Sequence, residues 1–173
     1  GHVPISVAEQ NIDLLSLSAH KFHGPKGVGA LYIRRGVRIE NIMHGGAQER
    51  GKRPGTYNQV GIAGLGKAIE IACADIEGNN RRLSQLRDHM IAEILRRIPD
   101  SRLNGHPTLR LPGNVNVSIA YIEGEGMLLH LDLAGIDASS GSACTSGALD
   151  PSHVLLAIGL SHETAHGSLR FSL

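Results

Sequence analysis

The sequence has few aromatic residues, few cysteines and no long apolar run. It contains no tryptophan, three tyrosines, two phenylalanines and two cysteines in 173 residues. No stretch approaches the roughly 20 apolar residues of a membrane-spanning helix, and no basic segment with an apolar signal core opens the chain. The two cysteines lie in very different surroundings, which argues against a disulfide framework. We therefore expect a cytoplasmic protein with reduced thiols and no membrane association.

The sequence also lacks an excess of charge of either sign. Its formal net charge is +1, so nothing calls for direct nucleic-acid binding or an acidic partner. Apolar residues make up 41% of the chain, which is enough for one ordinary domain or two small ones. The 22 glycines, set against so few aromatics, favour an α/β enzyme with tight turns near its ligands over a rigid binding module.

Hydrophobic patterning in the first 77 residues predicts two strands and a helix. We expect a buried strand at 12–18 and a second strand at 28–33, after the turn at Gly24-Pro25. A helix is expected at 59–76. Its glycines would be destabilising unless another segment packs closely against them. The apolar face expected for this helix comprises Val60, Ala63, Ala68, Ile69 and Ala72.

The turn-like residues 77–79 predict a boundary, after which the pattern is again mixed. An amphipathic helix is expected at 81–97, with strands at 115–119 and 168–173 and helices at 126–133 and 154–158. Asp150-Pro151 is typical of a helix cap followed by proline at the first helical position. The whole pattern predicts an α/β fold. The apolar face expected for the first of these helices comprises Leu83, Leu86, Met90, Ile94 and Leu95.

A lysine follows the first predicted strand, where a charge is hard to place. Lys21 stands between His20 and His23 and shortly after Ser18. A buried ammonium is costly unless it is paired, reaches water or is used chemically. Ser18 and His20 offer anion donors beside the amine, which is what a Schiff base to pyridoxal phosphate needs. A paired or solvated structural lysine is the alternative.

Four stretches together resemble the cysteine desulfurases of the NifS and IscS type, within the class V aminotransferase family. They are SAHKFHGPKGVGALYIRR (18–35), MHGGAQERGKRPGTYN (43–58), SSGSACTSGALDPSHVLLAIGL (139–160) and AHGSLRFSL (165–173). Their order and spacing agree with that family over nearly the whole chain. The resemblance implies a fold-type I α/β enzyme with a large and a small domain, and pyridoxal 5'-phosphate as cofactor.

The resemblance gives the cofactor contacts to residues of the first two stretches. Lys21 matches the lysine that forms the Schiff base and later moves protons, and Ser18 and His20 match phosphate contacts. Thr56 matches a threonine that reaches the partner's cofactor phosphate, which implies a homodimer with shared sites. Without the resemblance, Thr56 would be read as an ordinary turn hydroxyl. Lys26 follows a proline and is the less favoured cofactor lysine.

Cys144 matches the catalytic cysteine of the family. Small and polar residues surround it, so we expect an exposed thiol on a mobile loop; an idle surface cysteine is the alternative. The resemblance implies that its thiolate takes the sulfur of L-cysteine, which leaves L-alanine and a persulfide on Cys144. Cys73 lies within a predicted apolar helix and is expected to be buried and inert.

Arg170 matches the arginine that binds the substrate carboxylate. A planar guanidinium donates two parallel hydrogen bonds to a carboxylate, whereas a strand-end ion pair is the alternative reading of this position.

Residues 162–166 read HETAH and satisfy the H-E-x-x-H pattern of zinc proteases. That pattern requires a long helix and a third ligand. Residues 167–173 contain no His, Asp or Glu, so we expect no metal site here but a helix-to-strand connection.

The resemblance also predicts how the chain relates to a longer enzyme. Residues 1–77 would form part of the cofactor-binding large domain, and 78–173 most of the small domain with the cysteine loop. The family's aspartate on the pyridine nitrogen, its glutamine on the ring hydroxyl and its stacking histidine have no counterpart here. Because the ring nitrogen would not be held protonated, we expect the 173 residues alone to turn over little cysteine.

Three functions remain open at this point. The first is a cysteine desulfurase that supplies sulfur for iron–sulfur cluster assembly or tRNA thiolation, with a sulfur-acceptor or scaffold protein as partner. The second is a selenocysteine lyase-like enzyme, which the extended loop around Cys144 favours less. The third is a non-catalytic binding or scaffold piece.

Overall fold

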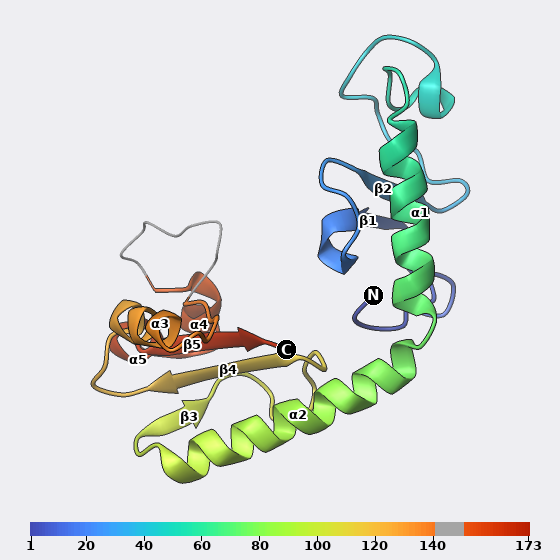
Figure 1. Ribbon diagram of the computed structural model, residues 1–173. Coiled ribbons are helices and arrows are strands. Elements are labelled where there is room, and N and C mark those ends of the chain that lie inside the picture. The colour runs from blue at the N-terminus through green and yellow to red at the C-terminus, as the bar shows by residue number, and fades with distance from the viewer. Residues whose placement is uncertain (141–150) are drawn as a thin grey trace. The chain divides into compact units, whose positions relative to one another are not determined.

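The computed structural model describes residues 1–140 and 151–173, which divide into two compact units. The first unit is Gly1–Glu77 and the second is Gly78–Leu173. Both contain helices and strands, so the α/β class predicted from the sequence is confirmed (Figure 1).

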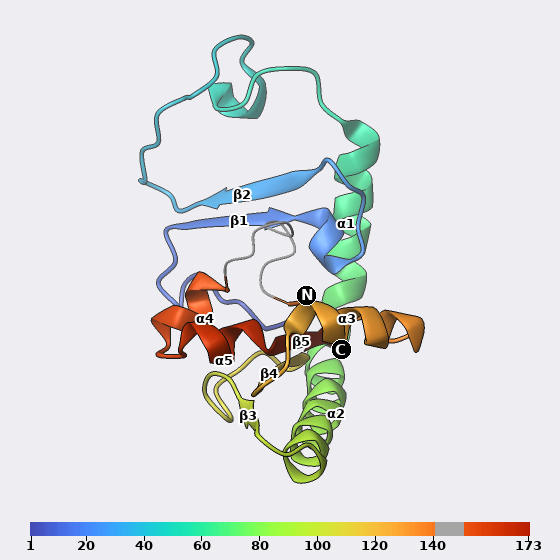
Figure 2. The ribbon, with the colours of Figure 1, turned by 90° about the vertical axis from the view of Figure 1, so that its left-hand side faces the viewer.

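The first unit is built on a two-stranded antiparallel ribbon. β1 (Leu14–Ser18) pairs with β2 (Gly29–Ile33), and one turn of 3-10 helix, η1 (Ala19–Phe22), follows β1 directly. A second 3-10 turn, η2 (Gln48–Gly51), precedes the helix α1 (Gln59–Cys73). Figure 2 shows β1 and β2 side by side, with η1 next to α1.

Small residues bring α1 close to the turn after η1. A side chain added at Gly64 would lie 2.5 Å from Cγ of Pro25, and one added at Gly24 would lie 3.0 Å from Cβ of Ala68. The close packing expected from the glycines of this helix is therefore confirmed at Gly64. Since Gly64, Ala68 and Ala72 are spaced by four residues, they lie along one face of α1.

Two expectations for this unit are wrong. β1 is not buried but alternates half-buried and exposed residues, because among the described residues it pairs only with β2 and packs on one side. Val60, placed on the apolar face of the helix, is 85% exposed, and Ala63 is exposed as well. The packed face of α1 is set instead by its small residues at 64, 68 and 72.

The second unit is a three-stranded antiparallel sheet with four helices among its described residues (Figure 1). The strand order is β3-β4-β5. The bounds of the strands are β3 (Ser101–Leu103), β4 (Asn114–Ile119) and β5 (Ser168–Ser172). The bounds of the helices are α2 (Ile76–Arg97, beginning at the unit boundary), α3 (Gly124–Leu133), α4 (His153–Ala157) and α5 (His162–His166).

The core of this unit comes from one face of the sheet. Val115 stands opposite Phe171 and Val117 opposite Leu169, so the four side chains share a face and all are buried. Ile91 of α2 and Met127 of α3 complete the buried cluster. The alternation predicted for 115–119 is thus present at Val115 and Val117 but not at Ser118, which is also buried. The alternation of β5 places Arg170 on the face opposite Leu169 and Phe171.

The helix predicted at 81–97 begins earlier, and its predicted apolar face is confirmed in part: Met90 and Ile94 pack against the core cluster, whereas Leu95 is exposed. α2 starts at Ile76 and runs through residues 77–79, where the division between the two units also falls. Arg87 and Ile91 are its buried residues, whereas Leu86 is 47% exposed. The helix cap predicted at Asp150-Pro151 is also wrong, because Ser152 occupies the cap position of α4; Asp150 itself lies outside the described residues.

Core packing around β5 should dominate the stability of the second unit. Leu169 is 4% exposed, so Leu169→Ala in the full-length protein is expected to lower the free energy of unfolding by about 2–5 kcal/mol. Leu109 is 81% exposed, and Leu109→Ala should change it by less than about 0.5 kcal/mol. Urea unfolding of both variants checks this, and equal losses would contradict the packing described here.

Within residues 1–140 and 151–173, none of the helices combines the length and apolar content that a membrane crossing requires.

Candidate functional site

The turn that carries Lys21 is fixed by backbone contacts on both sides. Ser18 ends β1 opposite Gly29, and the amide of Ala19 donates to the carbonyl of Val28 at 3.1 Å. The amide of Gly24 donates a hydrogen bond to the carbonyl oxygen of Ala19 at 2.9 Å, which closes the turn. Ala19 and Phe22 anchor the turn because both are buried.

Lys21 itself is exposed, which corrects the prediction of a lysine at the end of a buried strand. The chain leaves the strand at Ser18 and enters η1, where Ala19 and Phe22 point inward and His20 and Lys21 point outward. A 3-10 turn repeats every three residues, so the two inward positions fall on one side. The amine therefore needs no buried counter-charge.

These residues fit pyridoxal phosphate by the chemistry of their donors. Ser18, His20 and Lys21 are all exposed, and within the described residues the Ser18 hydroxyl and the His20 ring form no side-chain hydrogen bond. A hydroxyl and an imidazole N–H are free to donate to a phosphate, and the amine is free to condense with an aldehyde. The structure thus brings together three of the predicted site residues.

Thr56 lies elsewhere in the same unit. It is exposed in the loop between η2 and α1, at the end of α1 that points away from η1 (Figures 1 and 2). The side-chain oxygen of Gln48 accepts a hydrogen bond from the amide of Gly55 at 3.2 Å. The Tyr57 hydroxyl accepts one from the amide of Glu49 at 3.3 Å. The structure does not bring Thr56 to Lys21 of its own chain.

Arg170 lies in the second unit, in the middle of β5. Its backbone forms a two-way bridge to Ser139, with N–O distances of 3.0 and 2.6 Å. The residue is half-buried, and within the described residues its guanidinium forms no ion pair or hydrogen bond. The alternative reading, a strand-end ion pair, has no partner among the described residues.

The structure tests the prediction for one of the two cysteines only. Cys144 lies outside the described residues, so its predicted role and loop are untested. Cys73, predicted to be buried and inert, is exposed. It follows Ala72 on α1 and is turned about 100° away from the packed face, because each helical residue advances by that angle.

The HETAH pattern forms the short helix α5, and Ser161 caps it by accepting from the amide of Thr164. Five residues are too few for the long helix that the zinc pattern requires, and His162 and His166 are both exposed. In the described part of the chain, no three His, Cys, Asp or Glu side chains gather as metal ligands.

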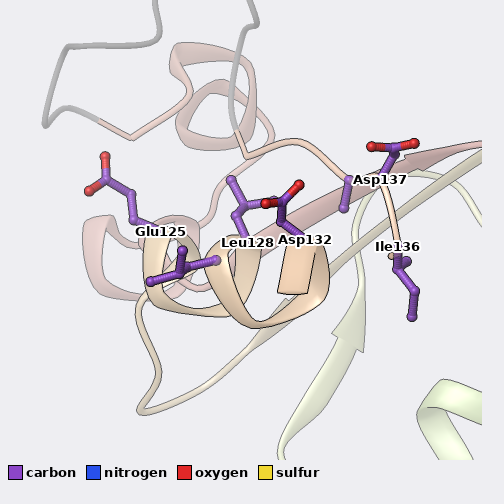
Figure 3. A pocket seen from close by; sticks show the side chains of 7 residues that line it. Glu125, Leu128, Asp132, Ile136 and Asp137 are labelled. Atoms are coloured by element: carbon purple, nitrogen blue, oxygen red, sulfur yellow. The ribbon is translucent and has the colours of Figure 1, made fainter. Parts of the chain in front are cut away.

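A cavity of about 400 Å³ lies beside α3 and contains none of the predicted site residues (Figure 3). Three carboxylates and four apolar side chains line it: Glu125, Asp132, Asp137, Leu128, Leu129, Ile136 and Ala138. Its last lining residue, Ala138, directly precedes Ser139, which bridges Arg170.

Two arginines of the second unit, the buried Arg87 and the half-buried Arg110, have structural roles. Arg87 pairs with Asp88 at 2.8 Å and donates to the carbonyl oxygen of Leu111 at 3.2 Å. Arg110 donates to the carbonyl oxygens of Asn104 and His106. Burial, followed by the nearby Arg87, lowers the pKa of Arg110. Their donors are used on the Asp88 carboxylate and on backbone carbonyls, so these arginines hold a loop rather than a ligand.

Sequence reasoning missed one neighbour of Lys21. Nε2 of His2 lies 3.3 Å from the carbonyl oxygen of Lys21, although the two residues are 19 positions apart in the chain. No spacing rule links two such residues, because the contact depends on how the segment before β1 folds back onto η1.

The family described as aminotransferase class V matches residues 1–173. The chain belongs to this family. Enzymes of the class V family that are cysteine desulfurases depend on pyridoxal phosphate, which agrees with the donors around Lys21. Among curated relatives of this class V chain, cysteine desulfurase IscS of Clostridium botulinum is 62% identical over all of the chain and 44% of its own length. Cysteine desulfurase IscS of Methanosarcina thermophila is 62% identical over all of the chain and 43% of its own length.

Two solved structures that resemble this chain belong to NifS-like proteins. A NifS-like protein superposes with a TM-score of 0.86 at 36% identity, covering 99% of this class V chain and 43% of that protein. A NifS-like protein from Rickettsia africae gives the same TM-score at 30% identity, covering 99% and 45%. The resemblance to cysteine desulfurases and the fold-type I α/β architecture are thereby confirmed. The chain spans less than half the length of these relatives.

Proposed function

We propose that these residues belong to a pyridoxal phosphate-dependent cysteine desulfurase that converts L-cysteine to L-alanine. The observation that carries the proposal is the 62% identity to cysteine desulfurases over the whole chain. The exposed turn with Ser18, His20 and Lys21 supports it, because its donors suit a phosphate and an aldehyde.

When bound, pyridoxal phosphate supplies an aldehyde for an amine and an electron sink for the substrate's α-carbon. Ser18 and His20 hold the phosphate by hydrogen bonds from a hydroxyl and an imidazole. Lys21 provides the amine and moves protons to and from the substrate carbon. Arg170 binds the substrate carboxylate and orients the substrate.

Cys144 is the sulfur acceptor in this proposal. Its thiolate attacks Sγ of the substrate cysteine, and a new S–S bond forms as the substrate's C–S bond breaks. The electron pair of the broken bond stays with the substrate, and a proton completes alanine. The substrate carbon is reduced and sulfur is oxidised to a persulfide, so the balance needs no external oxidant.

The remaining parts of the proposal concern partners. Thr56 is exposed in a loop and contributes its hydroxyl to the cofactor phosphate of a second copy, so the enzyme is a homodimer with shared sites. We place this homodimer in the cytoplasm. The persulfide passes its sulfur to an acceptor or scaffold protein of iron–sulfur cluster assembly or tRNA thiolation.

The proposed function is tested by incubating the full-length protein with pyridoxal phosphate and L-cysteine. The expected result is one alanine for each sulfur recovered, with the sulfur on the peptide that contains Cys144. Sulfur release without alanine would refute the proposal. A much higher rate with selenocysteine than with cysteine would favour the lyase instead.

Arg170→Lys tests the carboxylate contact. Lysine keeps the charge but cannot donate two parallel hydrogen bonds to the carboxylate, so KM for L-cysteine should rise about 10-fold or more. The visible absorbance of the bound cofactor should stay unchanged. Steady-state kinetics and an absorbance spectrum of the full-length variant check both. An unchanged KM with a lower kcat would contradict the assignment.

A further inference from the structure

His2 supplies a hydrogen bond that the turn around Lys21 cannot form by itself. In a helical turn, the carbonyl of Lys21 would accept from the amide of Gly24 or residue 25. Gly24 donates instead to Ala19 at 2.9 Å, and Pro25 has no amide hydrogen. Nε2 of His2 lies 3.3 Å from this carbonyl oxygen.

The segment before β1 holds His2 in place. A side chain added at Gly1 would lie 3.0 Å from Cβ of Ala72 and 3.1 Å from Cβ of Phe22, so this backbone lies against both α1 and η1. Phe22 is buried and belongs to the same turn as Lys21. The backbone next to His2 is therefore held by packing, and the His2 side chain contacts Lys21, whose own side chain projects outward.

We propose that His2 is a positioning residue, which donates from Nε2 to the carbonyl of Lys21 and fixes the direction of the Lys21 amine. A carbonyl oxygen only accepts, so the contact requires the proton on Nε2. This inference rests on the proposed function, because a fixed direction matters only if the amine reacts. His2 touches no reacting atom and acts through the backbone of Lys21.

The test uses the full-length protein and three variants. His2→Ala removes the donor, and His2→Gln keeps an N–H at a similar reach. His89→Ala removes an exposed imidazole from α2 and serves as the matched control. The first readout is hydrogen exchange of residues 19–24 without cofactor, and the second is the split between kcat and KM for L-cysteine with cofactor bound.

His2→Ala should speed exchange at residues 19–24 by about 2- to 12-fold, the range expected for one lost hydrogen bond. It should lower kcat by a similar factor and leave KM unchanged. His2→Gln and His89→Ala should behave like the parent protein. Parent-like exchange in His2→Ala, or a failure of His2→Gln to restore the turn, would overturn the inference. A parent protein that makes no alanine would refute the proposed function but leave the exchange result intact.

Discussion

Lys21→Ala in the full-length protein is expected to abolish both the visible absorbance of the bound cofactor and the turnover of L-cysteine. The amine of Lys21 has no substitute on η1, because no other residue of this turn carries a primary amine. Loss of the proton-transferring group alone should lower kcat by about 10²- to 10⁴-fold. Absorbance spectra and an alanine assay measure the two effects.

Lys26→Ala is the matched control for this prediction. Lys26 is also exposed and lies just past the turn at Gly24 and Pro25. Its removal should leave the spectrum and the turnover close to those of the parent protein. If instead Lys26→Ala loses the absorbance and Lys21→Ala keeps it, the assignment of the cofactor lysine is wrong.

Cys144→Ser should separate cofactor binding from sulfur transfer. Serine is not ionised near neutral pH and cannot replace the thiolate nucleophile, so alanine formation should fall at least about a hundred-fold. The visible absorbance should remain, because Ser18, His20 and Lys21 are unchanged. Alanine assays and persulfide labelling on the same preparation check both parts.

Cys73→Ser is the control for this experiment. Because Cys73 is exposed, it is an accessible thiol that could itself carry labelled sulfur. Cys73→Ser should nevertheless retain full alanine formation and persulfide labelling. Loss of labelling in Cys73→Ser, with normal labelling in Cys144→Ser, would show that the sulfur acceptor is Cys73 on α1 and not Cys144.

The parts of the fold that the sequence predicts well are those set by local pattern. Val115 and Val117 alternate with polar residues, and β4 buries both valines as predicted, although Ser118 is buried as well. The trio Ser18, His20 and Lys21 could be found because the three residues are neighbours in the chain. A 3-10 turn rather than a strand end was not foreseeable, since it depends on Ala19 and Phe22 packing inward.

The errors arise where tertiary contacts outweigh local preference. Residues 77–79 have a turn-like composition, and the division between the two units does fall there, yet α2 continues through them as a helix. Cys73 sits in an apolar helix but on its exposed side, because the packed face is set by contacts from Pro25 and Gly24. The bridge from Ser139 to Arg170 joins residues far apart in the chain and leaves no local signal.

The central claim is that the amine of Lys21 forms the covalent link to pyridoxal phosphate. The most direct measurement is borohydride reduction of the full-length protein with bound cofactor, followed by peptide mapping. The account predicts a single cofactor label, on Lys21 within residues 18–27. A label on Lys26 or on any other lysine would contradict it.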